Sequence, residues 1–196
     1  MSNEGNIKRL LEDRVEFKLY AAEQHLKNLK EIENAYGDIF TDNARIEVEI
    51  EVDCFLSQLI GAVDSLLFEI NCKLDLGIPA DHVNFPNVQS ALSAKTKKID
   101  LLSELDRARQ QGNWYYLLSE LKHQSVHRSF LERAIVLRDL PSKFGQSRFL
   151  DVKREFQDNS FDHVVDIGVI PYMSKSLQQV RELILFIRTR EPLLQQ

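Results

Sequence analysis

The fold is decided by the stretch VDCFLSQLIGAVDSLLFEINCKL, residues 52–74. Its aliphatic side chains recur at alternating steps of four and three residues, the spacing that places them on one face of an α-helix. The series is Val52, Leu56, Leu59, Val63, Leu66, Ile70 and Leu74. The pattern predicts a long, well-packed helix that ends near Gly77-Ile78-Pro79, because glycine and proline are common just after helices.

The start of this helix has two interpretations. Ile46, Val48 and Ile50 alternate with glutamates, which is typical of a short strand. Asp42 or Asn43, however, can cap the N-terminus of a helix, and the apolar pattern then continues without a break. We therefore favour a helix over this segment as well.

A second amphipathic pattern precedes this helix. Its apolar positions again follow steps of four and three, with Glu33 interrupting once, and they are Val15, Leu19, Ala22, Leu26, Leu29 and Tyr36. The rest of the segment is rich in Lys and Glu, so its other face should be solvated. We expect one helix over residues 4–36 that ends at Gly37 and serves as a docking or dimerisation arm.

Three more helices are expected, over residues 88–109, 114–133 and 173–190, with the last one buried through Leu177, Val180, Ile184 and Ile187. Residues 136–171 have no helical period and include a β-branched cluster at 164–170. A loop of this length without structure is uncommon in a compact domain. The prediction is a single domain over residues 1–196, mainly all-α, an up-and-down bundle of about five helices with a small irregular or β-hairpin excursion at 136–171.

Composition limits the class of protein. Hydrophobic residues make up 43% and charged residues 28% of the chain, an ordinary globular balance. The N-terminus lacks the apolar core of a signal peptide, and the most apolar run, 55–68, is shorter than the roughly 18 residues of a membrane span. We therefore expect a cytoplasmic protein without a membrane partner, in which Cys54 and Cys72 are buried, reduced thiols.

Charge and motifs exclude several functions. A net charge of −5 argues against a protein that coats nucleic acid by charge alone, although a local basic patch stays open. Glycine-rich phosphate loops and the sequence signatures of zinc proteases and serine hydrolases are missing. We expect no cofactor and no resident metal.

One polar run on the expected fourth helix carries chemistry. Residues 120–128 read ELKHQSVHR, and His123 and His127 lie one helical turn apart on one face. The simplest interpretation is a solvated helix face. A second is a metal site of Glu120, His123 and His127, because imidazole and carboxylate groups bind divalent ions. One helix offers at most these three ligands, so one of the histidines at positions 25, 82 and 163 would have to complete the shell.

A third interpretation comes from resemblance. The run Lys122-His123-Gln124-Ser125-Val126-His127 resembles the signature of the HEPN family, an Arg, a polar residue, a short spacer and a His. Residues 56–71, with an acidic residue at Asp64 amid apolar ones, are similar to the early core helix of that family. The resemblance covers roughly residues 45–134, somewhat under half of the chain, and its motif is short.

The resemblance implies a bundle of four to five helices that dimerises so that two motifs face a shared cleft. Many HEPN proteins are metal-independent RNases of toxin or defence type, while others only bind nucleotides or partners. By position, Lys122 takes the Arg slot, His123 the polar slot and His127 the His slot. RNA and an antitoxin-like protein partner are then the expected partners, beside a second copy of the chain.

The Lys in place of Arg departs from the family pattern. Lysine lacks the planar fork that grips a phosphate bidentately, although Arg128 could supply part of that role. His127 would transfer protons, and Lys122 and Arg128 would stabilise charge on the phosphate. Asp64 would either orient a basic side chain from the neighbouring helix or simply face water. Two alternatives stay open, a catalytically inactive interaction module and a metal-binding bundle. Trp114, Tyr115 and Tyr116 are expected in the core or at a dimer interface rather than stacked on bases.

Overall fold

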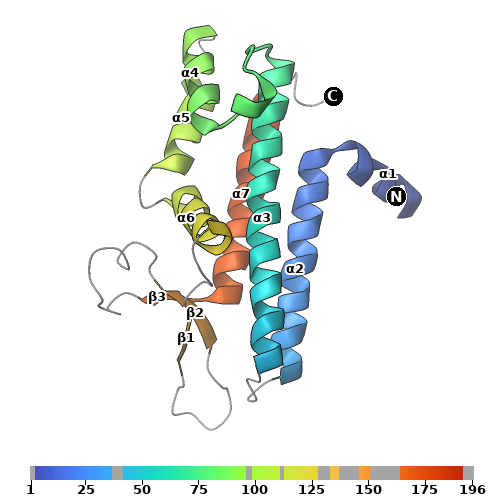
Figure 1. Cartoon of the computed structure of the whole chain (residues 1–196). Helices are drawn as coiled ribbons and strands as arrows, with labels where there is room; N and C mark the ends of the chain where they lie inside the picture. Colours follow the sequence, from blue (N-terminus) through green and yellow to red (C-terminus); the bar gives the residue numbers. More distant parts are fainter. Residues whose placement is uncertain are drawn as a thin grey trace.

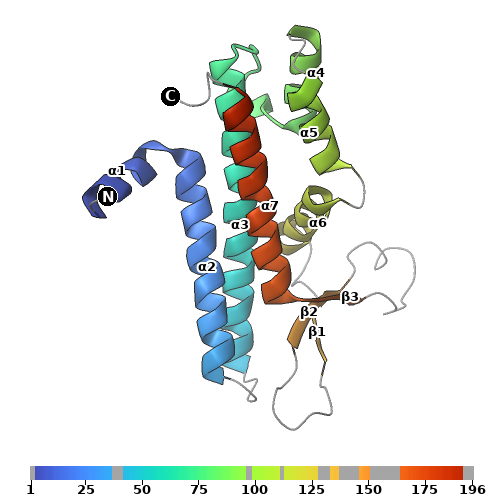
Figure 2. The ribbon, with the colours of Figure 1, turned by 180° about the vertical axis from the view of Figure 1, so that it is seen from behind.

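A computed structural model describes residues 3–36, 42–95, 99–110, 113–127, 133–136, 146–150 and 164–191. The long helix α3 (Asp42–Lys73) is at the centre of the bundle, with α2 (Arg14–Tyr36) along one side (Figure 1). Helix α7 (Val169–Arg190) runs along the back of α3 (Figure 2) and contacts both α2 and α3. The predicted all-α class is confirmed.

The stretch that opened the sequence argument forms the core as expected. Val52, Leu56, Leu59, Val63, Leu66 and Ile70 are all fully buried, and Leu74 is partly buried. The helix begins at Asp42, so the helical interpretation of residues 46–52 is confirmed. After Lys73 the chain turns through Asp75 and Gly77, both with positive φ. The buried amide of Asn71 holds this turn, because it donates to the carbonyl of Ile78 at 2.8 Å and accepts from its N–H at 3.1 Å.

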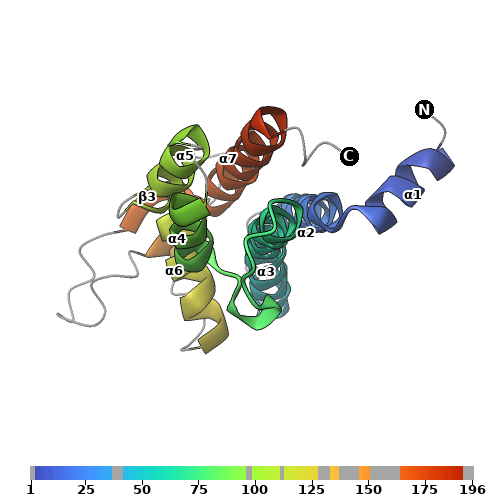
Figure 3. The same cartoon turned by 90° about the horizontal axis from the view of Figure 1, so that it is seen from above.

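The predicted helix over 4–36 is broken at Asp13 into α1 (Asn3–Glu12) and α2. Oδ1 of Asp13 accepts hydrogen bonds from the backbone N–H groups of Val15 and Glu16 at 3.0 and 3.1 Å. This is an N-cap, which starts a new helix at the following residue. The predicted apolar face of α2 is confirmed through buried Val15, Leu19, Ala22, Leu26 and Leu29. The inner face of α2 is thus part of the core. Of the two helices that replace the predicted one, only α1 extends away from the bundle (Figures 1 and 3).

The predicted helix over 88–109 is also two helices, α4 (Phe85–Lys95) and α5 (Ile99–Arg109), preceded by the short 3-10 helix η1 (Ala80–His82). The side chain of Gln89 joins α4 to α5 through hydrogen bonds with Asp106 and Arg109. Because these partners lie late in α5, the two helices fold back on each other. Buried Val88, Leu92 and Leu105 anchor the pair to the core.

Helix α6 (Trp114–His127) packs on α3 and buries Tyr115, Leu118 and Leu121. Trp114, which was expected in the core or at a dimer interface, is only partly buried, and so is Leu117. The predicted helix end at Arg133 is wrong, because Arg133 is the first residue of strand β1. The core position of Tyr115 follows from its ring contact with Phe85, at 4.6 Å between centroids.

The excursion between α6 and α7 holds a small antiparallel sheet in the order β1-β2-β3. Its strands are β1 (Arg133–Val136), β2 (Gln146–Leu150) and β3 (Val164–Gly168). Arg133 pairs with Phe149 in the first ladder, and Arg148 pairs with Gly168 in the second. The expected β-hairpin excursion therefore begins slightly earlier than residue 136 and leads directly into α7.

Helix α7 buries Leu177, Val180, Ile184 and Ile187, as predicted. It begins at Val169, earlier than the expected Met173, because Pro171 is tolerated in the first turn of a helix. The expectation of two buried thiols is wrong: Cys54 is half-buried and Cys72 is exposed, and both are free. None of the described helices combines the length and the apolar character needed to cross a membrane.

Candidate functional site

The candidate site is centred on the second half of α6, where the HEPN-like run lies beside α3 (Figure 1). Buried Leu118 and Leu121 fix the rotation of α6 about its axis. This rotation leaves Lys122 half-buried at the edge of the core and His123 exposed to solvent. The first basic position of the motif is thus held by packing, while the second is at the surface.

Asp64 of α3, an exposed residue, lies within electrostatic range of this lysine. Packing around the carboxyl raises the pKa of Asp64 above its usual value, and the positive charges of Lys122 and Lys18 act in the opposite direction. A carboxylate that feels two ammonium groups lies within their electrostatic reach. Two predicted site residues that are far apart in the sequence, Lys122 and Asp64, are therefore within electrostatic range of each other.

Lys18 of α2 is the third charged group of the site. Its Nζ donates to Oε1 of Gln58 at 2.8 Å, and its aliphatic stem crosses Gly61, where an added Cβ would lie 3.3 Å from Cε of the lysine. Burial and the nearby charge of Arg14 lower the pKa of Lys18, while Asp64 raises it. Gly61 therefore leaves room for the lysine stem between Gln58 and Asp64 on the surface of α3.

Tyr115 closes the site on the core side. Its hydroxyl shares a hydrogen bond with Ser119 one turn later on α6. Burial raises the pKa of Tyr115, and the negative charge of Asp64 raises it further, so the phenol stays protonated at neutral pH. Asp64 thus lies within electrostatic range of a neutral hydroxyl and two ammonium groups.

This arrangement has a clear electrostatic character. The two lysines and one carboxylate carry a net charge of +1, on a chain whose total is −5. An anion such as a phosphate is attracted to ammonium groups that protein contacts already hold in place. Chemically, the cluster can bind and stabilise negative charge, but proton transfer at neutral pH needs a histidine.

The remaining predicted site residues are less well placed by the structure. His127 is the last residue of α6, and its side chain lies outside the described residues, as does all of Arg128. Their roles stay predictions.

The metal-site alternative gains no support from the described side chains, which contain no group of three His, Cys, Asp or Glu suited to an ion. Nδ1 of His25 lies 2.7 Å from a carboxylate oxygen of Glu51 between α2 and α3. His82 lies beside Asp81 on η1. His163 and the side chain of His127 are outside the described part, so the proposed set of ligands as a whole is not tested.

Two residues of this site were missed by sequence reasoning, Lys18 and Gln58. The available signal was Gly61, a glycine inside a long helix of large apolar residues, which often marks a close approach of another group. Comparison with protein-family models found no match, and neither curated proteins nor solved structures gave one. The HEPN resemblance therefore depends on the residues quoted above.

Proposed function

We propose that this chain is a HEPN-like, cytoplasmic protein that acts on RNA as a homodimer and cleaves it without a metal ion. The observation that supports the proposal is that Asp64 of α3 lies within electrostatic range of Lys122 of α6. In the HEPN interpretation Asp64 orients a basic side chain. We assign this role to the pair of Asp64 on α3 and Lys122 on α6.

The proposed reaction uses few groups. His127 accepts the proton of a ribose 2′-hydroxyl, whose oxygen attacks the adjacent phosphorus and forms a 2′,3′-cyclic phosphate. The bond from phosphorus to the 5′-oxygen breaks, and that oxygen takes a proton from His127 of the second protomer. Lys122, and Arg128 after it, stabilise the charge that develops on the phosphate oxygens. His123 provides the polar contact of the motif.

The test is cleavage of structured RNA in EDTA by the wild-type protein and by variants. We expect His127→Ala to lower the rate about 10²- to 10⁴-fold, the usual contribution of a general acid or base. Lys122→Arg should cleave at least as fast as the wild type, because the guanidinium restores the bidentate grip. Lys73→Met, an exposed lysine at the end of α3, is the matched control. Equal cleavage by wild type and His127→Ala would remove His127 from the mechanism.

A second candidate function is a catalytically inactive interaction module. Helix α1 favours it, because Ile7 and Leu11 lie one turn apart on this projecting helix and are 53% and 76% exposed. Under this proposal α1, and not the whole segment 1–36, is the docking or dimerisation arm. Replacing Ile7 and Leu11 with Ser would abolish the dimer in light scattering. If both the wild type and Lys122→Arg bound RNA without cleaving it, the inactive interaction module would be favoured over the RNase.

A further inference from the structure

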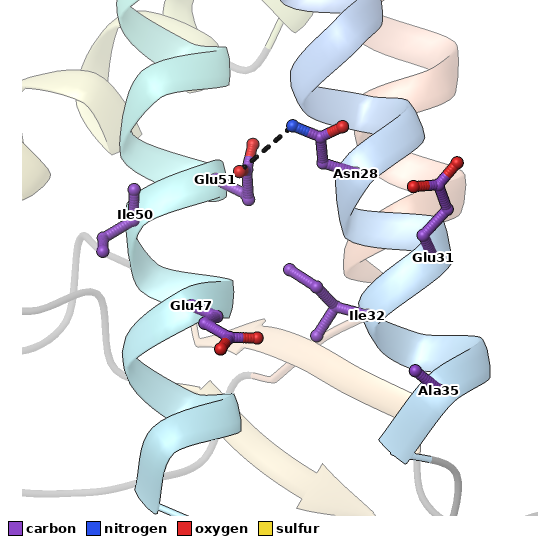
Figure 4. Close-up of a pocket in the computed structure, with 7 residues that line it drawn as sticks. All are labelled: Asn28, Glu31, Ile32, Ala35, Glu47, Ile50 and Glu51. Carbon is purple, nitrogen blue, oxygen red and sulfur yellow. Dashed lines mark hydrogen bonds between the residues drawn. The ribbon is translucent and has the colours of Figure 1, made fainter.

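A surface groove between α2 and α3 lies apart from the candidate site, nearer the end of the bundle where α2 ends and α3 begins. It has a volume of about 450 Å³ and is lined by Asn28, Glu31, Ile32, Ala35, Glu47, Ile50 and Glu51. Figure 4 shows Ile32 and Glu47 pointing toward each other between the two helices. Glu31 and Ile50 flank the groove on its outer sides (Figure 4).

One end of the groove is held in shape by hydrogen bonds across the two helices. Nδ2 of Asn28 donates to Oε1 of Glu51 at 3.2 Å, and Nδ1 of His25 lies 2.7 Å from Oε2 of the same carboxylate. Because both oxygens of Glu51 are engaged from α2, the spacing of the two helices is fixed here. The groove is therefore preformed, which lowers the cost of binding a partner.

The groove combines an apolar interior with negative charge. Three of its lining residues are glutamates and none is Lys or Arg. Lys27, one turn before Glu31 on α2, lies 3.6 Å from that carboxylate in an exposed pair, so it offsets part of this negative charge. Negative charge also acts on the neighbouring part of α3. Burial raises the pKa of the Cys54 thiol, and the charges of Glu51, which lines the groove, and of Asp53 raise it further. Phosphate groups of RNA or of an anionic membrane would be repelled from this surface.

Exposed aliphatic side chains continue the groove along α3. Ile46 and Ile50 lie one turn apart and are 59% and 53% exposed. Two large apolar residues at this spacing match the ridge of side chains that an amphipathic helix presents to a groove. A flexible polyamine would satisfy the carboxylates but would leave these side chains in water.

We propose that this acidic groove binds a cationic amphipathic helix of a protein partner, with apolar anchors against Ile32 and Ile50 and Arg or Lys side chains beside Glu31 and Glu47. The inference is independent of the proposed RNase activity. The groove and the cluster around Asp64 carry opposite charge, so a partner helix and an RNA would bind different parts of the surface.

The test uses a labelled synthetic helix of about 15 residues, long enough for roughly four turns, with Leu on one face and Arg on the other. Its control is a peptide of the same composition in scrambled order. Fluorescence anisotropy with the full chain should give at least about tenfold tighter binding of the amphipathic peptide, because only this peptide offers an apolar face to the groove. Hydrogen exchange should slow in residues 28–35 and 46–51 when the peptide binds.

Variants separate the groove from general attraction to an acidic protein. Glu31→Gln with Glu47→Gln should weaken binding about three- to tenfold, since two exposed ion pairs are lost. Ile50→Ser should weaken it about fivefold through lost apolar burial. Asp75→Asn with Asp81→Asn, exposed carboxylates beyond the other end of α3, removes the same charge and should change affinity less than twofold.

Three results would overturn the proposal. The first is equal affinity for the amphipathic and scrambled peptides, and the second is equal weakening by the groove pair and the control pair of variants. Full displacement of the peptide by spermidine at equal charge concentration would also reject it, because the groove would then act only as a counterion site. All these substitutions are at exposed or groove-lining positions, so loss of folding is not expected.

Discussion

Replacing Arg188 with Met tests how the ends of three helices are held together. Nη1 and Nη2 of Arg188, on α7, donate to the two carboxylate oxygens of Asp13 at 2.8 and 3.1 Å. Nη2 also donates to Glu69 on α3 at 2.8 Å, and Glu16 on α2 lies 3.4 Å from Nη1. One guanidinium thus joins the N-cap of α2 to both neighbouring helices, and Met keeps the apolar stem without the charge.

The magnitude follows from burial. Removing one partner of a buried ion pair costs about 3–5 kcal/mol. Here the side chain of Arg188 is 18% exposed and its partners are 19–30% exposed, so water solvates part of the charge that is left behind. Discounting the cost by about half for this solvation gives about 2 kcal/mol at pH 7. For a chain of this size that corresponds to a drop in Tm of roughly 4–8 °C.

The pH dependence separates this ion pair from simple packing. Burial raises the pKa of Asp13, but hydrogen bonds from Arg188 and from the backbone of Glu16 and Val15 outweigh it, and the net pKa is lowered from 3.8. A carboxyl with a depressed pKa adds stability above its unfolded pKa, and this stability is lost as the pH falls through the folded pKa. Arg188→Met removes the part of the depression that is due to Arg188, so the deficit of the variant should shrink between about pH 5 and pH 3.

The assay is urea denaturation followed by circular dichroism at pH 7 and near pH 3.5. Arg181→Met is the matched control, because Arg181 lies on the same helix and pairs with exposed Glu23 at 2.9 Å. An exposed pair contributes at most about 1 kcal/mol. The reasoning is refuted if Arg188→Met costs no more than Arg181→Met, or if its cost is the same at both pH values.

Three further substitutions have defined signs, and thermal denaturation measures each. Gly61→Ala should stabilise the protein by about 0.5–1 kcal/mol, because glycine inside a helix costs that much relative to alanine and the flexible end of Lys18 can move from the new methyl group. Gly77→Ala should destabilise it by about 1–2 kcal/mol, because Gly77 has a φ of +75°, a conformation that is costly for residues with a Cβ. If Gly61→Ala and Gly77→Ala changed the stability in the same direction, both assignments would be contradicted. Asn71→Ala should cost about 2 kcal/mol, because the C=O and N–H of Ile78 would lose their side-chain partner. A cost under about 0.5 kcal/mol would mean that Asn71 does not hold this turn.

The central helix could be predicted from the sequence because its environment is the same along its length. Every position on the inner face of α3 from Val52 to Ile70 is buried, so a single period describes it. The break at Asp13 escaped that argument, since Leu11 and Val15 are also four residues apart and the period continues across it. A local signal was present: Asp13 is followed three residues later by Glu16, the spacing of a capping box.

The candidate site was predictable only in part. Asp64 was expected to orient a basic side chain because of the HEPN resemblance, but the sequence did not name Lys122 as that side chain. Lys18 was not expected at the site, because its approach to α3 depends on the register of two packed helices, which a periodic pattern does not fix. The antiparallel packing of α5 against α4 could not be predicted from the apolar pattern either, because hydrogen bonds of the Gln89 side chain hold the two helices together.

The distribution of charge allows a quantitative prediction for RNA binding. The described part of the site provides two ammonium groups, Lys18 and Lys122, although the chain as a whole is acidic. We assume that each of these two lysines neutralises one phosphate of single-stranded RNA. A plot of the logarithm of the binding constant against the logarithm of the salt concentration should then have a slope of about −1.4 for one protomer and about −2.8 for a dimer. Lys18→Met should reduce the slope, while Lys27→Met, an exposed lysine on the same helix paired with Glu31, should leave it unchanged. A slope as steep as about −5 would mean that RNA contacts a different basic surface, and the cluster around Asp64 would then have no part in recognising phosphate.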